Sequence, residues 1–131
     1  MKILFVLLVA MLPITGFCQF GGKQVIKING LGLDQLVKGL LDAGYSIEKS
    51  EASLSVIVTH IKQSPATGIG TLIKAKLQGG NVLLSGQYSE PGKPAETCPI
   101  TDSGSPGSPC MTSWKLMQDL AESFNKPMEI L

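Results

Sequence analysis

The chain has 131 residues, with 11 basic and ten acidic side chains, and all the basic residues are lysines. A nearly neutral chain without arginine is a poor candidate for nucleic-acid or phosphate recognition, in which arginine forks dominate. The same balance argues against electrostatic binding to an anionic membrane. The length fits one domain, and an apolar content of 44% is enough for one core.

Residues 1–18 have the features of a secretory signal peptide. Met1-Lys2 is a basic start, residues 3–12 are an unbroken apolar run, and Gly16 and Cys18 are small residues at the positions that signal cleavage. The run is shorter than the roughly 20 residues that span a bilayer. We predict cleavage after Cys18, which leaves a single domain over residues 19–131 in the periplasm or outside the cell.

Cys18 has an alternative interpretation as the lipidated cysteine of a bacterial lipoprotein. That motif requires a small residue just before the cysteine and a leucine three residues before it, whereas this chain has Phe17 and Thr15 there. A lipid on Cys18 would tether the protein to a membrane. The mismatches make cleavage the favoured interpretation.

A strand, a helix and a second strand are expected over residues 25–49, and the rest of the fold is organised around them. Gly44 suits the residue after the helix, because glycine accepts a positive φ there. Apolar and polar residues alternate from Tyr45 to Glu48, as in a half-buried strand. The helix is predicted from apolar residues at helical spacing, which must bury against a sheet: Leu33, Leu36, Val37, Leu40 and Leu41.

Three further strands are expected before a long loop. Residues 54–61 and 71–78 have strand-like patterns, and the second segment alternates apolar with polar side chains. Gly79-Gly80 predicts a tight hairpin that returns the chain into a strand over residues 82–88. Proline, glycine and serine make up 12 of the 22 residues of segment 89–110, which predicts a long irregular excursion.

A second helix is expected after this loop, capped by Thr112 or Ser113 and stopped before Pro127. Residues 128–131 can add a short edge strand. The predicted fold is therefore α+β, in the order β-α-β-β-β-β-α, with one mostly antiparallel sheet and both helices packed on one face.

Cys98 and Cys110 are the strongest pair of chemically active residues. They would be the remaining cysteines of an exported chain after Cys18 is lost, and a disulfide between them would close the loop at 89–110. In the chain-entropy model such a bond stabilises a domain by about 3 kcal/mol. A redox site would require the CxxC spacing, and a metal site would require further ligands. We predict a structural disulfide between Cys98 and Cys110.

The other candidate residues are expected to be structural or solvated. His60 is the single histidine and lies in no catalytic motif. The Gly30–Gly32 turn lacks the third glycine of a dinucleotide loop, because Gln35 stands there, and the Gly68–Thr71 segment lacks a phosphate-binding lysine. We therefore predict no catalytic residue, no cofactor and no metal. Trp114 on the second helix is expected to be a core anchor. Four acids are expected to be solvated in turns or loops: Glu48, Glu51, Glu90 and Glu96.

The order of elements resembles small periplasmic α+β domains, such as the helix-grip domains of the outer-membrane assembly lipoprotein BamC. The residues that carry this resemblance are structural, so the resemblance implies a fold and carries over no functional site. The loop with Cys98 and Cys110 departs from that pattern. The resemblance depends on the following residues: Leu36, Leu40, Leu41, Ala43, Gly44, Tyr45, Gly79, Gly80, Trp114, Met117 and Leu120.

An export signal without a catalytic set favours a non-enzymatic envelope protein that binds or scaffolds other proteins. The expected contact surfaces are the loop at 89–110 and an exposed sheet edge, with an unknown envelope protein as partner. The alternative is a carrier of a lipid or another small hydrophobic ligand in a cavity between sheet and helix. We expect no nucleic-acid partner and no transmembrane span after residue 18.

Overall fold

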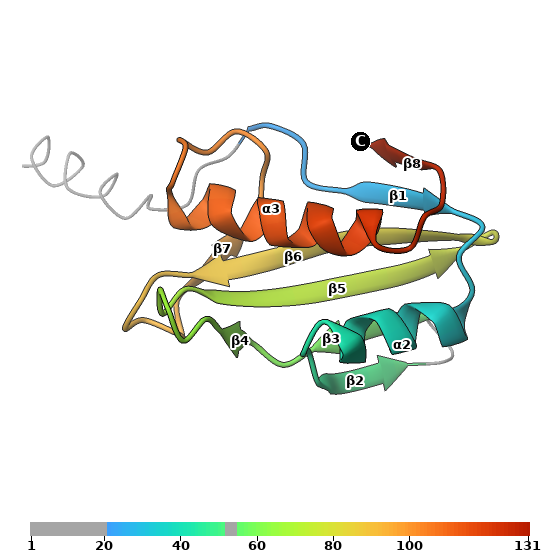
Figure 1. The fold of residues 1–131 in the computed structure, drawn as a ribbon, viewed down its shortest axis with the longest axis horizontal. Helices are drawn as coiled ribbons and strands as arrows, with labels where there is room; N and C mark the ends of the chain where they lie inside the picture. The colour runs from blue at the N-terminus through green and yellow to red at the C-terminus, as the bar shows by residue number, and fades with distance from the viewer. Residues whose placement is uncertain (1–20, 52–54) are drawn as a thin grey trace, which may run out of the picture.

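The computed structural model describes residues 21–51 and 55–131, which form one antiparallel sheet with two helices on it (Figure 1). The predicted leader, its cleavage site and the possible lipid anchor at Cys18 lie outside these residues. The helices are α2 (Leu33–Asp42) and α3 (Pro109–Glu122). The strands are β1 (Ile26–Asn29), β2 (Ile47–Glu51), β3 (Val56–Thr59), β4 (Lys62–Gln63), β5 (Gly70–Gln78), β6 (Asn81–Ser89), β7 (Thr97–Pro99) and β8 (Met128–Ile130).

The sheet is built around the long hairpin of β5 and β6. The strand order is β2-β3-β5-β6-β1-β8, with β4 added to β5 and β7 added to β6, and all these pairings are antiparallel. The hairpin turns at Gly79 and Gly80, whose φ angles of +59° and +83° are accessible to glycine at little cost. The hairpin prediction is confirmed, and β8 confirms the predicted edge strand.

Both helices lie on the same face of the sheet (Figure 1). Helix α3 crosses β5 and β6, and α2 lies toward the β2 end. The α+β prediction with two helices on one face is therefore confirmed. Apolar side chains from both helices and from the central strands form one core between the layers: Leu36, Leu40, Met117, Leu120, Ile26, Ile28, Ile73, Ala75 and Leu84. Neither α2 nor α3 is long and apolar enough to span a bilayer.

The apolar stripe of α2 is only partly buried. Leu36 and Leu40 are fully buried, but Leu33 and Leu41 remain 49% and 53% exposed. Because α2 lies toward the edge of the sheet, none of the described elements covers the flank that carries these two leucines. Gly44 ends the helix with φ +93°, as predicted.

Two element boundaries differ from the prediction. The strand expected over 54–61 is shorter in the structure, where β3 covers Val56–Thr59, and the separate strand β4 (Lys62–Gln63) follows it; both pair with β5. Helix α3 begins at Pro109, earlier than expected, because Ser108 Oγ accepts a hydrogen bond from Met111 N at 3.2 Å. Proline is well suited to this first helical position, since its missing N–H has no partner there anyway.

The predicted disulfide between Cys98 and Cys110 is not formed, because Cys110 is a free, buried cysteine. Cys98 lies on β7 opposite Tyr88, whereas Cys110 lies in the first turn of α3. The Cys110 thiol is held by Thr101, with Sγ 3.4 Å from the backbone N and 3.5 Å from the carbonyl O. Hydrogen bonds therefore hold Cys110 where the prediction placed a covalent bond.

Candidate interaction surfaces

His60 lies on the surface at the end of β3, and its only ionic neighbour among the described residues is Glu48. The His60 Nδ1 atom is 3.9 Å from Glu48 Oε2, and both side chains are 54% exposed. Such an exposed pair contributes little to stability. No group of three histidine, cysteine or acidic side chains in the described chain could hold a metal ion.

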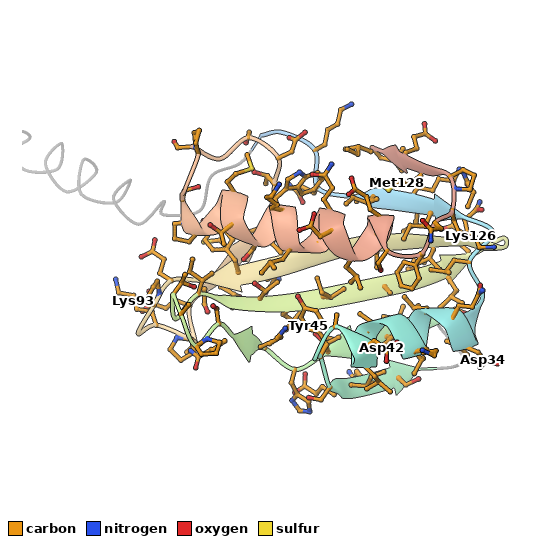
Figure 2. All side chains as sticks on the ribbon, viewed as in Figure 1. Asp34, Asp42, Tyr45, Lys93, Lys126 and Met128 are labelled. Atoms are coloured by element: carbon orange, nitrogen blue, oxygen red, sulfur yellow. The ribbon has the colours of Figure 1, made fainter. Side chains whose placement is uncertain are left out.

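The middle of the loop at 89–110 packs against the rest of the domain and forms hydrogen bonds with it. Ile100 is fully buried, and its N–H donates to Gly86 O at 3.0 Å. Asp102 exchanges hydrogen bonds with Lys23, at 2.7 Å through its carboxylate and 3.0 Å through its backbone N–H. The loop therefore presents only short exposed segments, including residues 90–96, with Lys93 at the end of the molecule opposite Lys126 (Figure 2).

A polar layer lies under the N-terminal half of α3. The Thr71 and Ser113 hydroxyls are 2.7 Å apart, and both residues are buried. Tyr88 lies nearby, and its pKa is raised first by burial and further by Cys110 and Glu90. Thr71 and Ser113 therefore satisfy one another away from solvent.

An open groove of about 560 Å³ separates the two helices. Its apolar lining includes Gly39 of α2 and the C-cap residue Ala43, with Leu120 and Phe124 on the other side. The core between the helices and the sheet is filled by buried side chains. The groove therefore offers space for a ligand between the helices, whereas the sequence had suggested a cavity between sheet and helix.

Lys62 closes one end of this groove. Its ammonium donates to Ala43 O at 2.7 Å and lies 5.1 Å from the centroid of the Tyr45 ring. Ala43 is the C-cap of α2, so Lys62 places a positive charge at the negative end of the helix dipole. Burial raises the pKa of Tyr45. Tyr45 and Asp42 lie together at this end of α2, and Asp34 lies at the other (Figure 2).

The edge of the sheet at β2 combines an unpaired strand with exposed apolar side chains. Strand β2 pairs with β3 on one side and has no neighbour among the described strands on the other. Leu33, Val37 and Leu41 follow one another at intervals of four residues along α2, on the flank that faces away from α3. We call this row the leucine flank and the free side of Ile47–Glu51 the β2 edge.

Of the residues singled out in the sequence, His60 lies near Glu48, whereas Cys98 and Cys110 lie on β7 and in α3. Gly30 and Gly68 are turn residues with φ +75° and +78°, and Trp114 is buried in the core, as expected. The exposed sheet edge was anticipated, but the leucine flank was not, because all five apolar residues of α2 were expected to be buried. The sequence contained a signal for this flank, because the five apolar residues of α2 cover a wider arc of the helix surface than contact with one sheet requires.

The comparisons with known proteins leave the family of this chain open: no protein-family model matches it, and no curated protein matches it.

Proposed function

We propose that this protein is a non-enzymatic binding module that receives an extended segment of a partner protein at the β2 edge. The leader-like sequence of residues 1–18 supports an exported protein that works in the periplasm or outside the cell. The observation that carries the proposal is the position of an unpaired strand beside an uncovered apolar helix flank. Edge strands of this kind bind extended peptides by adding one strand to the sheet.

The two parts of the surface have separate roles. The backbone of β2 supplies hydrogen bonds, which give affinity with little dependence on the partner's sequence. The leucine flank supplies selectivity, because every second side chain of an incoming strand faces the same side of the sheet. Covering the exposed half of Leu33 or Leu41 would contribute about 1 kcal/mol each. A partner segment with alternating apolar residues fits this arrangement best.

The same edge would be a liability if it had no partner. Long, flat and apolar edges aggregate, and proteins protect them with charges or bulges. Strand β2 carries Glu48 and Lys49, and its register with β3 shifts between Ile47 and Lys49. These features restrict pairing to the second half of the strand, so a short partner segment is expected.

A peptide-display experiment tests the proposal while the partner is still unidentified. A random peptide library is selected on the wild-type protein, and enriched peptides are measured against the variant L33S/L41S. The matched control is L116S/L131S, because Leu116 and Leu131 are 42% and 48% exposed and lie elsewhere. We expect alternating apolar peptides that bind the wild type and the control, and bind L33S/L41S at least tenfold more weakly.

Amide hydrogen exchange identifies the mode of binding in the same samples. A peptide that adds a strand should slow exchange of the outward N–H groups of β2. Peptides that protect the 90–96 segment instead would assign binding to the loop, which was the other contact predicted from the sequence. Equal affinity for L33S/L41S and the wild type would refute the role of the leucine flank.

The groove supports a second candidate function, as a carrier of a small amphipathic or hydrophobic molecule. Its volume of about 560 Å³ lies within the roughly 300–1,000 Å³ of typical ligand sites. Native mass spectrometry of protein purified from its original host would detect added mass. Bare protein from the host would count against this function. The resemblance to BamC stays a prediction and contributes to neither proposal.

A further inference from the structure

The face of the sheet opposite the helices carries a concentration of lysines. Lys74 and Lys76 alternate with the buried residues of β5, and therefore point away from α2 and α3. Lys27 and Lys76 both lie opposite Leu83, so the three residues form one row across the sheet. Lys49 and Lys74 both lie opposite Val58 and form a second row in the same way. We call the surface formed by these four lysines the lysine face.

The register places fewer acids than lysines on this face. Lys27, Lys74 and Lys76 make no ion pair within the described part of the chain. Glu129, opposite Lys27 on the edge strand β8, and Glu51, opposite Val56 on β2, are the two acids that the register places on this side, against four lysines. Other acids occupy the helices and the loop, on different sides of the protein: Asp34, Asp42, Asp119, Glu122, Glu90, Glu96 and Asp102. Positive charge is therefore concentrated on one face of the sheet, although the chain as a whole is nearly neutral.

The lysine face has an apolar component as well. Val56, Val58, Leu72 and Leu83 lie on it, and each is half-buried. Lysine stems can lie over such side chains while the ammonium groups reach outward. The register places no aromatic residue there, and the chain has no arginine. Protein interfaces usually depend on aromatic and arginine anchors, so this face does not have the composition of a protein-docking site.

We propose that the lysine face binds the surface of an anionic lipid bilayer. Along β5 the two lysines are about 7 Å apart, and Lys76 and Lys27 are about 10 Å apart across two strand spacings. A spread of point charges across a sheet face suits a layer of negative headgroups better than a single phosphate, which favours a fork or a pocket. A second copy of the same face would be repelled, because its charge has the same sign.

This interaction does not depend on the function proposed for the β2 edge. With the lysine face against a bilayer, α2, α3 and the groove point away from the lipid, and the β2 edge lies at the side of the domain. Each lysine near an anionic surface strengthens binding about fivefold at moderate salt. Binding should therefore be weak, reversible and sensitive to ionic strength.

Vesicle co-sedimentation of the full chain tests the inference. The probes are vesicles of phosphatidylcholine alone and of equal parts phosphatidylcholine and phosphatidylglycerol, at about 50 mM and about 300 mM salt. The test variant is K74Q/K76Q, and the control is K93Q/K115Q, which removes the same charge from the loop and from α3. All four lysines are exposed, so each variant should retain the circular dichroism spectrum of the wild type.

We expect the wild type to bind only the anionic vesicles, and to bind more weakly at the higher salt. K74Q/K76Q should lose roughly 25-fold in partition coefficient, and the control no more than about twofold. Equal binding to both vesicle types would indicate insertion of apolar residues and overturn the proposal. No wild-type binding, equal loss in both variants, or binding to poly-glutamate without binding to vesicles would overturn it as well.

Discussion

The hydroxyl groups of Thr71 and Ser113 lie 2.7 Å apart in the core and join β5 directly to α3. Both residues are buried, so removing one hydroxyl leaves the other without a partner and without water. We expect Thr71→Val or Ser113→Ala alone to lower the free energy of unfolding by about 1–3 kcal/mol.

The double variant T71V/S113A distinguishes this pairing from general packing. Because neither polar group remains, it should be less destabilised than the two single variants predict by addition. Urea denaturation of the four proteins gives the coupling free energy directly. A coupling free energy near zero would mean that the two hydroxyls do not depend on one another.

Exposure divides the leucines of α2 into two groups with different expected effects. Leu36→Ala should destabilise the protein by about 2–5 kcal/mol, because Leu36 is fully buried in the core. Leu33→Ala should change the free energy of unfolding by no more than about 0.5 kcal/mol. A large loss of stability for Leu33→Ala would show that the leucine flank is covered within the domain, and would remove it as a binding surface.

Lys62 fastens the C-terminal end of α2 to β4. Lys62→Met keeps an aliphatic stem but removes the ammonium that contacts Ala43 O and the Tyr45 ring. We expect a loss of about 1 kcal/mol, because a hydrogen bond and a cation–π contact at an exposed residue are each modest. Amide exchange should accelerate at Gly44 and Tyr45. Lys38→Met, which removes the exposed ion pair with Asp42, is the control and should have a smaller effect.

Local sequence patterns predicted the parts of this fold that depend on neighbouring residues. The Gly79-Gly80 hairpin, the alternation along β5 and the glycine after α2 each follow from backbone conformation or from side-chain periodicity. The start of α3 was placed too late because Thr112 and Ser113 were considered as caps, whereas Ser108-Pro109 is also a sound start signal.

Local sequence patterns could not predict features that depend on contacts between segments far apart in the sequence. The pairing of Cys98 with Cys110 was inferred from compartment and loop length, but Thr101 holds the thiol in the folded chain. The lysine face arises because β1, β2 and β5 are brought into one sheet, and the sequence does not reveal the order of strands. Gly86 was an overlooked signal of close approach, since a Cβ atom there would meet Ile100.

The state of Cys110 is open to a chemical test. A buried thiol should react slowly with iodoacetamide in the native protein and rapidly in denaturant without reductant. Peptide mapping should then find Cys110 alkylated, and Cys110→Ala should remove that modification. Recovery of a peptide in which Cys110 is joined to Cys98 would contradict the structure.

Alkaline pH should weaken the fold through its two buried tyrosines. Burial raises the pKa of Tyr45 above the ordinary value of 10.0, and the pKa of Tyr88 is raised for the same first reason. Well below pH 10 both are protonated in the folded and unfolded states, so neither makes stability depend on pH. As the pH rises through about 10 the unfolded chain loses these protons first, and the free energy of unfolding therefore falls. Urea denaturation between about pH 8 and 11 should show this fall, and Tyr45→Phe should make it shallower. An unchanged slope in Tyr45→Phe would mean that the Tyr45 hydroxyl is solvated in the folded protein.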